Sequence, residues 1–204
     1  MAAHTHAWLF PIVPGVQKTE FHQKTIAINA FYESAPRWPY PCGTIQAAGL
    51  MEAWLSYAAP MRSAVATLLR NSFQVFVMTE ALPSKDAGFS LSDDGPKLLS
   101  WPRPNKKALT TLRRLALDIF RSAGYVVWGP PRSKTDWHPV GTARMGNDPR
   151  TSVTNSHCRT HDIDGLYIVD ASSLPRTGAV NTGLTIAAIA LRVAQTIQKN
   201  LRKG

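Results

Sequence analysis

Cysteine is scarce in this 204-residue chain, which contains only Cys42 and Cys158. Two cysteines cannot provide the disulfide framework of a small secreted scaffold, and no four-ligand zinc pattern can be built from them. A disulfide between the two is possible, although no other feature of the sequence supports it. Small disulfide-stapled domains and cysteine-based zinc modules are therefore excluded.

Long hydrophobic runs are missing as well. No apolar stretch approaches the roughly 18–20 residues that span a bilayer, so we expect no transmembrane segment. The apolar residues 7–16 are interrupted by Pro11, Pro14 and Gly15 and lack a basic leader, which argues against a signal peptide. Localisation stays undetermined, with the cytoplasm as the default. His4 and His6 lie near a terminus that we expect to fray, and we assign them no function.

Acidic residues are few: 13 Asp and Glu stand against 23 Lys and Arg, which gives a formal net charge of +10. A positive net charge of this size is compatible with binding to nucleic acid, to an anionic membrane or to an acidic protein. The basic residues are spread along the chain, however, and no homeodomain, zinc-finger or RNA-recognition motif is present. We therefore expect no nucleic-acid partner. The hydrophobic fraction of 44% indicates a folded globular protein.

Residues 1–131 and residues 132–204 are built differently. The first part has short β-prone runs and helical patterns, typical of the α+β class. Strands are predicted at Ile26–Phe31 and Ser72–Thr79. A hairpin is predicted in which Phe89–Leu91 pairs with Leu98–Trp101 around the turn at residues 93–96. Helices are predicted at Gly49–Leu69, interrupted at Pro60, and at Asn105–Ala123.

The second part contains a polar loop, a short β-branched run at Leu166–Val169 closed by Asp170, a loop of small residues, and a helix predicted at Leu184–Leu201. A loop that leads into a helix N-terminus forms a cradle for anionic or electron-rich ligands, because the first N–H groups of the helix are unpaired and carry the positive end of its dipole. Structural connections between strands and helices have the same pattern, so this signal is generic.

Several common motifs are absent or incomplete. No G-x-G-x-x-G or G-x-S-x-G is present, and the glycines at 141 and 146 lack the Lys-Ser/Thr of a P-loop. His157, Cys158 and His161 have metal-ligating side chains but no further clear ligand, so we expect no metal site.

One series of residues is specific. It runs from Asp136-Trp-His-Pro-Val-Gly-Thr-Ala-Arg-Met-Gly146 through Arg159–Ser172 to Val180-Asn-Thr-Gly-Leu-Thr-Ile186. In order, spacing and residue type it closely resembles the C-terminal signature of the glucose–methanol–choline (GMC) family of flavin oxidoreductases. The resemblance is strong over Asp136–Gln198, extends only to the layout of elements over Phe73–Tyr125, and is absent before that.

The resemblance implies an α+β fold. It would consist of an antiparallel substrate-domain sheet with helices in residues 1–131, followed in residues 132–204 by the active-site loop, strand and helix that end a flavin-binding α/β domain. The glycine-rich N-terminal half of that domain is missing. The chain therefore resembles the C-terminal portion of such an enzyme, as a gene fragment, a truncated piece or one subunit. We expect an N-terminal FAD-binding half or subunit as partner, and poor FAD binding and solubility without it.

The resemblance also assigns roles to residues. His138 matches the base that takes the hydroxyl proton of an alcohol while a hydride moves to flavin N5, and Asn181 matches the second polar contact to the substrate oxygen. Asp170, Ala171, Asn181 and Thr182 match positions that meet the FAD. The implied function is that of an alcohol oxidase or dehydrogenase. A hydroxynitrile lyase of the same fold and a non-catalytic remnant or basic interaction subunit remain alternatives, and the alcohol and the electron acceptor stay undetermined.

Overall fold

The computed structural model describes residues 1–12, 26–36, 38–48, 71–84, 86–100, 105–129 and 137–202. The chain divides into two compact units. The sheet unit contains residues 5–79 and 106–135, and the loop unit contains residues 1–4, 80–105 and 136–204. Each unit is assembled from segments far apart in the sequence. The division after residue 131 stays a prediction.

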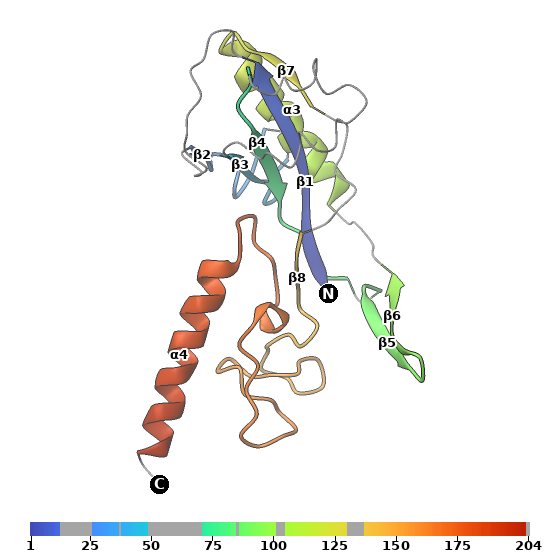
Figure 1. Ribbon diagram of the computed structural model, residues 1–204, viewed down its shortest axis with the longest axis vertical. Helices are drawn as coiled ribbons and strands as arrows, with labels where there is room; N and C mark the ends of the chain where they lie inside the picture. Colours follow the sequence, from blue (N-terminus) through green and yellow to red (C-terminus); the bar gives the residue numbers. More distant parts are fainter. Residues whose placement is uncertain are drawn as a thin grey trace. The chain divides into compact units, whose positions relative to one another are not determined.

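The sheet unit is built on antiparallel strands, as predicted (Figure 1). Its strands follow the spatial order β2-β3-β4-β1-β7. β1, which begins in the loop unit, pairs with β4 through Ala7↔Val77, and β3 pairs with the other edge of β4 through Ile45↔Val77. The strands are β1 (Ala2–Ile12), β2 (Ala27–Ile28), β3 (Gly43–Ala47), β4 (Val75–Thr79) and β7 (Val126–Trp128).

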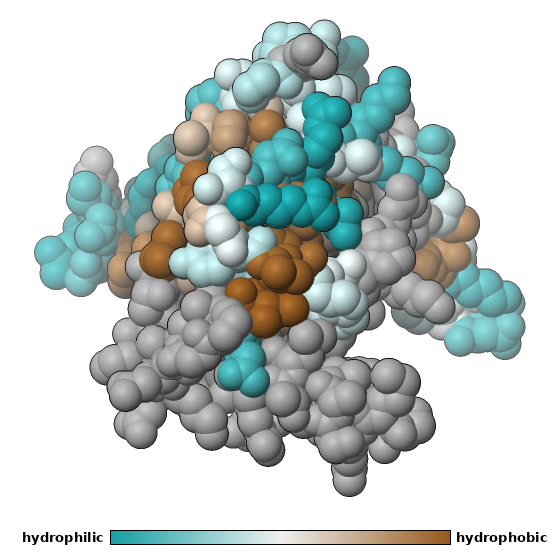
Figure 2. Space-filling model, turned by 90° about the horizontal axis from the view of Figure 1, so that it is seen from above, coloured by the Kyte–Doolittle hydropathy of each residue, from teal (hydrophilic) through white to brown (hydrophobic). Residues whose placement is uncertain are grey.

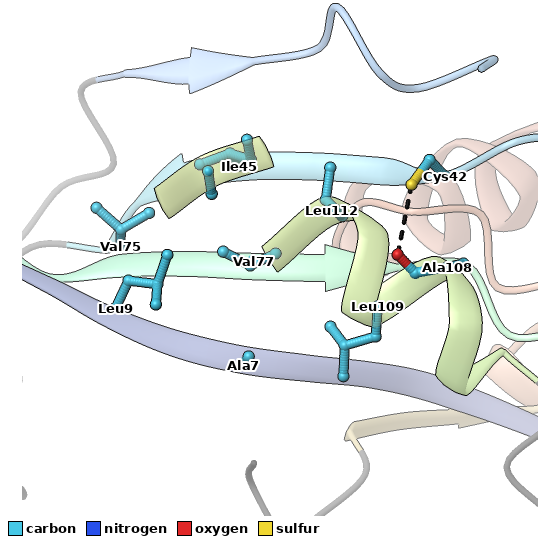
Figure 3. Packing of buried hydrophobic residues seen from close by; sticks show 10 residues of the cluster. Ala7, Leu9, Cys42, Ile45, Val75, Val77, Ala108, Leu109 and Leu112 are labelled. Carbon is cyan, nitrogen blue, oxygen red and sulfur yellow. Dashed lines mark hydrogen bonds between the residues drawn. The ribbon is translucent and has the colours of Figure 1, made fainter. Parts of the chain in front are cut away.

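Helix α3 (Lys106–Ser122) covers this sheet with an apolar stripe in which Leu109, Leu112 and Ala116 recur at helical spacing. The stripe packs against apolar side chains of β1, β3 and β4, and these residues form the core of the unit (Figure 3). Cys42 belongs to the same core, and its thiol donates to the carbonyl of Ala108 at 3.5 Å. Burial raises the pKa of this thiol to about 11, so it stays protonated at neutral pH. Both Cys42 and Cys158 are free, without a disulfide.

The loop unit contains the predicted hairpin, β5 (Gly88–Ser92) with β6 (Gly95–Ser100), and the predicted last helix, α4 (Gly183–Leu201). Its other regular elements are β8 (Trp137–Val140) and the short 3-10 helix η2 (Ala171–Ser173). The start of β1 pairs with β8 through Ala2↔Val140 and His4↔Trp137. A small core lies where β1, β8, η2 and α4 meet, and it contains Ala2, Ala81, Val140, Leu174, Ala171, Ile186 and Ile189.

Three expectations for the elements need correction. Leu166–Val169 does not form a regular strand: Tyr167 makes an isolated bridge with Arg159, and no ladder extends from it among the described residues. The predicted strand at Ile26–Phe31 is reduced to the two residues of β2. The terminus that we expected to fray is instead the start of β1, and it is buried from Ala2 onward. The predicted helix at residues 49–69 lies outside the described residues.

Hydrophobic side chains also reach the surface. The face seen in Figure 2 carries brown hydrophobic areas among teal hydrophilic ones. On α4, Leu184 and Leu201 are largely exposed, and Val193 is buried. In the part of the chain that the structure describes, no helix combines the length and hydrophobicity that crossing a membrane requires.

Candidate active site

His138 lies in β8 in an unusual backbone conformation. Its φ angle is +57°, in the left-handed region that side chains other than glycine seldom adopt, and the next residue is Pro139. A residue before proline is further restricted to extended conformations. Such a conformation costs of the order of 1–3 kcal/mol and persists only where the surrounding structure enforces it. The position of the half-buried His138 ring is therefore imposed by its neighbours.

His4 in β1 is a direct neighbour of this ring. The Nδ1 atoms of His4 and His138 lie 3.0 Å apart, and the two rings meet edge to face with their centroids at 5.1 Å. The other ring nitrogen of His4, Nε2, lies 3.0 Å from the carbonyl oxygen of Gly178. His4 is completely buried and thus links β8 to the loop that precedes α4.

Burial controls the charge of His4. Desolvation, together with the nearby His138, lowers the pKa of His4 to about 4. Backbone hydrogen bonds to Gly178 and Thr177 and the charge of Glu80 act in the opposite direction, but they are the smaller effects. His4 is therefore a neutral imidazole at physiological pH.

The loop that carries the Gly178 carbonyl is held from two sides. The hydroxyl of Thr177 accepts the N–H of Ala81 at 3.1 Å and lies 2.9 Å from the Gly178 carbonyl oxygen. Arg176 donates two hydrogen bonds of 2.7 Å to the carboxylate of Glu80, which is 6% exposed. Gly178 itself has a φ angle of +63°, which glycine adopts without strain. These contacts fix the carbonyl that faces His4.

Asn181 and Thr182 follow directly at the start of α4. Asn181 is exposed, whereas Thr182 is 5% exposed and is the N-cap of the helix. The side chain of Thr182 makes no capping hydrogen bond. A Cβ atom at Gly183 would meet no atom within 4 Å, so the first turn of the helix is open to its surroundings. The predicted helix start is thus correct, with Thr182 in the capping position.

Asp170 and Ala171 begin the 3-10 turn η2. The Asp170 carboxylate accepts the N–H of Ser172 at 2.8 Å, so this side chain is engaged in holding the turn. The N–H groups of Ala143 and Met145, shortly after β8, donate to the carbonyls of Ser172 and Ser173 at 3.0 and 2.8 Å. The structure therefore brings η2, β8 and the first turns of α4 around one small core.

His4 is the site residue that sequence reasoning missed. The sequence holds no local signal for this role, because it depends on contacts with residues 134 and 174 positions away. His161 has a local role: its Nε2 lies 3.1 Å from the Ser152 hydroxyl and 3.2 Å from the Gly146 carbonyl. Across the described residues, no group of three or more His, Cys, Asp or Glu side chains is arranged to hold a metal ion.

Comparison with known proteins gives consistent matches. A family model described as GMC oxidoreductase matches residues 102–190. The chain is 30% identical over 144 residues to the fructose dehydrogenase large subunit of Gluconobacter japonicus, a match covering 66% of the chain. It is 35% identical over 145 residues to the 2-methyl-1,2-propanediol dehydrogenase of Mycolicibacterium austroafricanum, covering 63%. In both matches the chain spans 26% of the relative's length.

A solved structure has the same fold. The crystal structure of pyridoxine 4-oxidase from Mesorbium loti superposes with a TM-score of 0.58 at 19% sequence identity. The match covers 97% of this chain and 44% of that one. At this identity the likeness supports the fold alone, and this chain corresponds to less than half of the longer protein.

Proposed function

Because the chain belongs to the GMC oxidoreductase family, we propose that it is the C-terminal part of an FAD-dependent alcohol oxidase or dehydrogenase, with His138 as its base. The observation that carries the proposal is the enforced position of His138, which combines a positive φ with a buried hydrogen-bond partner. Strained, well-supported side chains cluster at active sites.

The chemistry of the residues fits this role. Oxidising an alcohol requires a base for the hydroxyl proton, and imidazole suits it because its ordinary pKa is near neutrality. His138 removes the proton from the substrate oxygen. Asn181 donates its amide N–H to the same oxygen and thereby orients the alcohol. A bound FAD would supply the acceptor for the hydride that leaves the alcohol carbon.

The start of α4 fits a flavin. Its first-turn N–H groups have no partner within the helix and receive no capping hydrogen bond from Thr182, and Gly183 leaves the approach open. Such donors stabilise negative charge on an electron-rich ring edge. Asn181 and Thr182 would hold this edge. Since the Asp170 carboxylate is engaged within η2, Asp170 and Ala171 would meet the cofactor through their backbone groups.

The proposal includes a partner. The G-x-G-x-x-G loop that binds the ADP half of FAD is absent from this sequence, so an N-terminal FAD-binding half or subunit supplies it. We expect the 204-residue chain alone to hold FAD poorly and to associate through its exposed apolar residues. Titrating FAD into the purified chain, with flavin fluorescence and size-exclusion chromatography as readouts, tests this. A monodisperse monomer that binds FAD at submicromolar concentration contradicts it.

The function itself is tested by flavin absorbance in the FAD-loaded protein. Anaerobic addition of an alcohol should bleach the absorbance of the oxidised flavin, because the substrate hydride reduces it. Diols and sugars are the first substrates to try, since the relatives described above are named for them. A flavin that stays oxidised with every alcohol, while a cyanohydrin is cleaved, would favour the lyase alternative instead. The names of these relatives favour the oxidoreductase.

A further inference from the structure

Two partly buried hydrogen bonds connect His138 to a backbone carbonyl through His4. They run from His138 Nδ1 to His4 Nδ1 and from His4 Nε2 to the carbonyl oxygen of Gly178, each at 3.0 Å. His4 precedes His138 by 134 residues and Gly178 by 174, so the chain of contacts exists only in the folded loop unit. His4 is fully buried, and water does not compete for its nitrogens.

The protons on this chain of contacts follow from elementary rules. A carbonyl oxygen can only accept a hydrogen bond, so the Nε2 of His4 carries a proton. A neutral imidazole has one N–H, so the Nδ1 of His4 carries a lone pair. Two ring nitrogens 3.0 Å apart need one proton between them, and it must therefore reside on the Nδ1 of His138. When His138 is neutral, its Nε2 then carries the lone pair.

The same arrangement serves both protonation states of His138. A proton taken up at the Nε2 of His138 leaves its Nδ1–H unchanged, so the bond to His4 persists before and after the transfer. A charged His4 would instead direct an N–H at the N–H of His138. Burial prevents this by keeping the pKa of His4 near 4, and the groups that face His4 are His138, Glu80 and the backbone of Thr177 and Gly178.

The terminal acceptor is also fixed. Gly178 lies between Thr177, which is bound to Ala81, and the start of α4, and Arg176 is held by Glu80. A carbonyl that cannot turn away keeps the proton on the Nε2 of His4. The direction of the whole series of hydrogen bonds is thus set by the backbone.

We propose that His4 is a positioning residue that fixes the tautomer of His138, so that the Nε2 of His138 is the atom that removes the alcohol proton. This inference rests on the proposed function, in which His138 is the base. An isolated imidazole favours the opposite tautomer, with the proton on Nε2, and His4 reverses that preference without touching the substrate.

The tautomer can be observed without any catalytic assay. Long-range ¹⁵N–¹H correlation spectra distinguish protonated from unprotonated ring nitrogens. They are recorded on the protein with the N-terminal half supplied and this chain labelled with ¹⁵N-histidine, and the His138 signals are identified by their loss in His138→Ala. We expect a protonated Nδ1 and an unprotonated Nε2 for His138 at neutral pH. A His138 that carries its proton on Nε2 in the wild-type chain overturns the inference.

A matched pair of variants separates positioning from packing. Asn and Leu have similar shapes, and the Oδ1 of Asn takes the place of the His Nδ1 acceptor. In the FAD-loaded protein, with the N-terminal half supplied, His4→Leu should slow flavin reduction by about 10- to 100-fold, part of the contribution of a general base. His4→Asn should stay close to wild type and keep the His138 tautomer.

The outcomes distinguish this inference from the proposed function. If His138→Ala reduces flavin at the wild-type rate, the proposed function is wrong. If His138→Ala is slow and His4→Leu is as fast as wild type, the function stands and the inference is wrong. Equal slowing by His4→Leu and His4→Asn, with the native tautomer retained in both, shows a packing role and also overturns the inference.

Discussion

Inside the sheet unit and inside the loop unit, different kinds of contact stabilise the structure. In the sheet unit, apolar side chains of three strands and one helix pack into a hydrophobic core. In the loop unit, η2 is the only regular element from Gly141 to Thr182, a range described in full. That stretch depends on single hydrogen bonds, such as the one from the Ser152 hydroxyl to the Asp148 carbonyl at 2.7 Å, and on ion pairs such as Arg159–Asp164.

The difference shows how stability and function are divided. Burying apolar area stabilises a unit without specifying where one nitrogen atom lies. Directional hydrogen bonds do specify it, at a small net stabilisation of about 1 kcal/mol each. The candidate catalytic and cofactor-binding residues all belong to the loop unit. Substitutions in this unit should therefore change chemistry, and substitutions in the core of the sheet unit should change folding.

The largest effect is expected for His138→Ala. In the FAD-loaded protein it should slow flavin reduction by an alcohol by about 10²- to 10⁴-fold, because it removes the base. The bound flavin spectrum and the thermal midpoint should change little, since the ring is only half-buried. Stopped-flow absorbance and thermal unfolding measure the two quantities. A large fall in the thermal midpoint, together with an unchanged rate of flavin reduction in the folded fraction, would contradict this division between chemistry and stability.

Leu112→Ala should give the opposite pattern. Leu112 is fully buried between α3 and the sheet, and its truncation leaves a cavity that destabilises the unit by about 2–5 kcal/mol. Urea unfolding measures the change. Leu115→Ala, a change on the same helix at a half-buried position, is the control and should cost less. An unchanged midpoint in Leu112→Ala would show that this core does not govern the stability of the unit.

An acid-dependent loss of stability should come from His4. Its pKa is about 4 in the folded chain against 6.5 for an ordinary histidine. Between these values the unfolded chain binds a proton at His4 and the folded chain does not, so the folded state loses stability as pH falls from about 6.5 to about 4. The loss amounts to about 3 kcal/mol. Unfolding of wild type and His4→Asn across this range measures it, and equal pH slopes for both proteins contradict it.

The smallest effect is expected for Gly141→Ala, directly after β8. Gly141 has a φ of +83°, and an added Cβ would lie 3.3 Å from the carbonyl oxygen of Leu174. The strain should destabilise the loop unit by about 1–3 kcal/mol and loosen the position of His138. Gly124→Ala, with a similar φ of +87° and no atom within 4 Å of the added Cβ, is the matched control in the sheet unit. Thermal midpoints and flavin-reduction rates should both fall more for Gly141→Ala.

The sequence predicted best the elements whose patterns are local. The helices at 106–122 and 183–201 have apolar stripes of helical period, and the hairpin at 88–100 has a strong turn at its centre. β1 was missed because burial of nearly all of its residues leaves no alternation to detect, and because Pro11 lies within it. Leu166–Val169 was predicted as a strand from its β-branched residues, but a strand also needs a partner along its length.

The candidate site was predictable only in part. His138, Asn181 and the residues at 170–171 were found through a family resemblance, and their roles stay predictions. His4 was not found, since its importance depends on a contact between residues 134 positions apart. Neither composition nor periodicity contains that information. A buried polar residue shows its function only when its hydrogen-bond partners are known.

The long sequence separation between His4 and its two partners also has a kinetic consequence. During synthesis His4 leaves the ribosome well before Gly178, which follows it by 174 residues. Contacts of such high separation close large loops and form late in folding. A chain that has not finished folding would therefore contain His138 without the His4 contact that orients it. Catalytic activity would then appear among the last events of folding. The recovery of activity over time would therefore follow the completion of folding more closely than the formation of helix or sheet does.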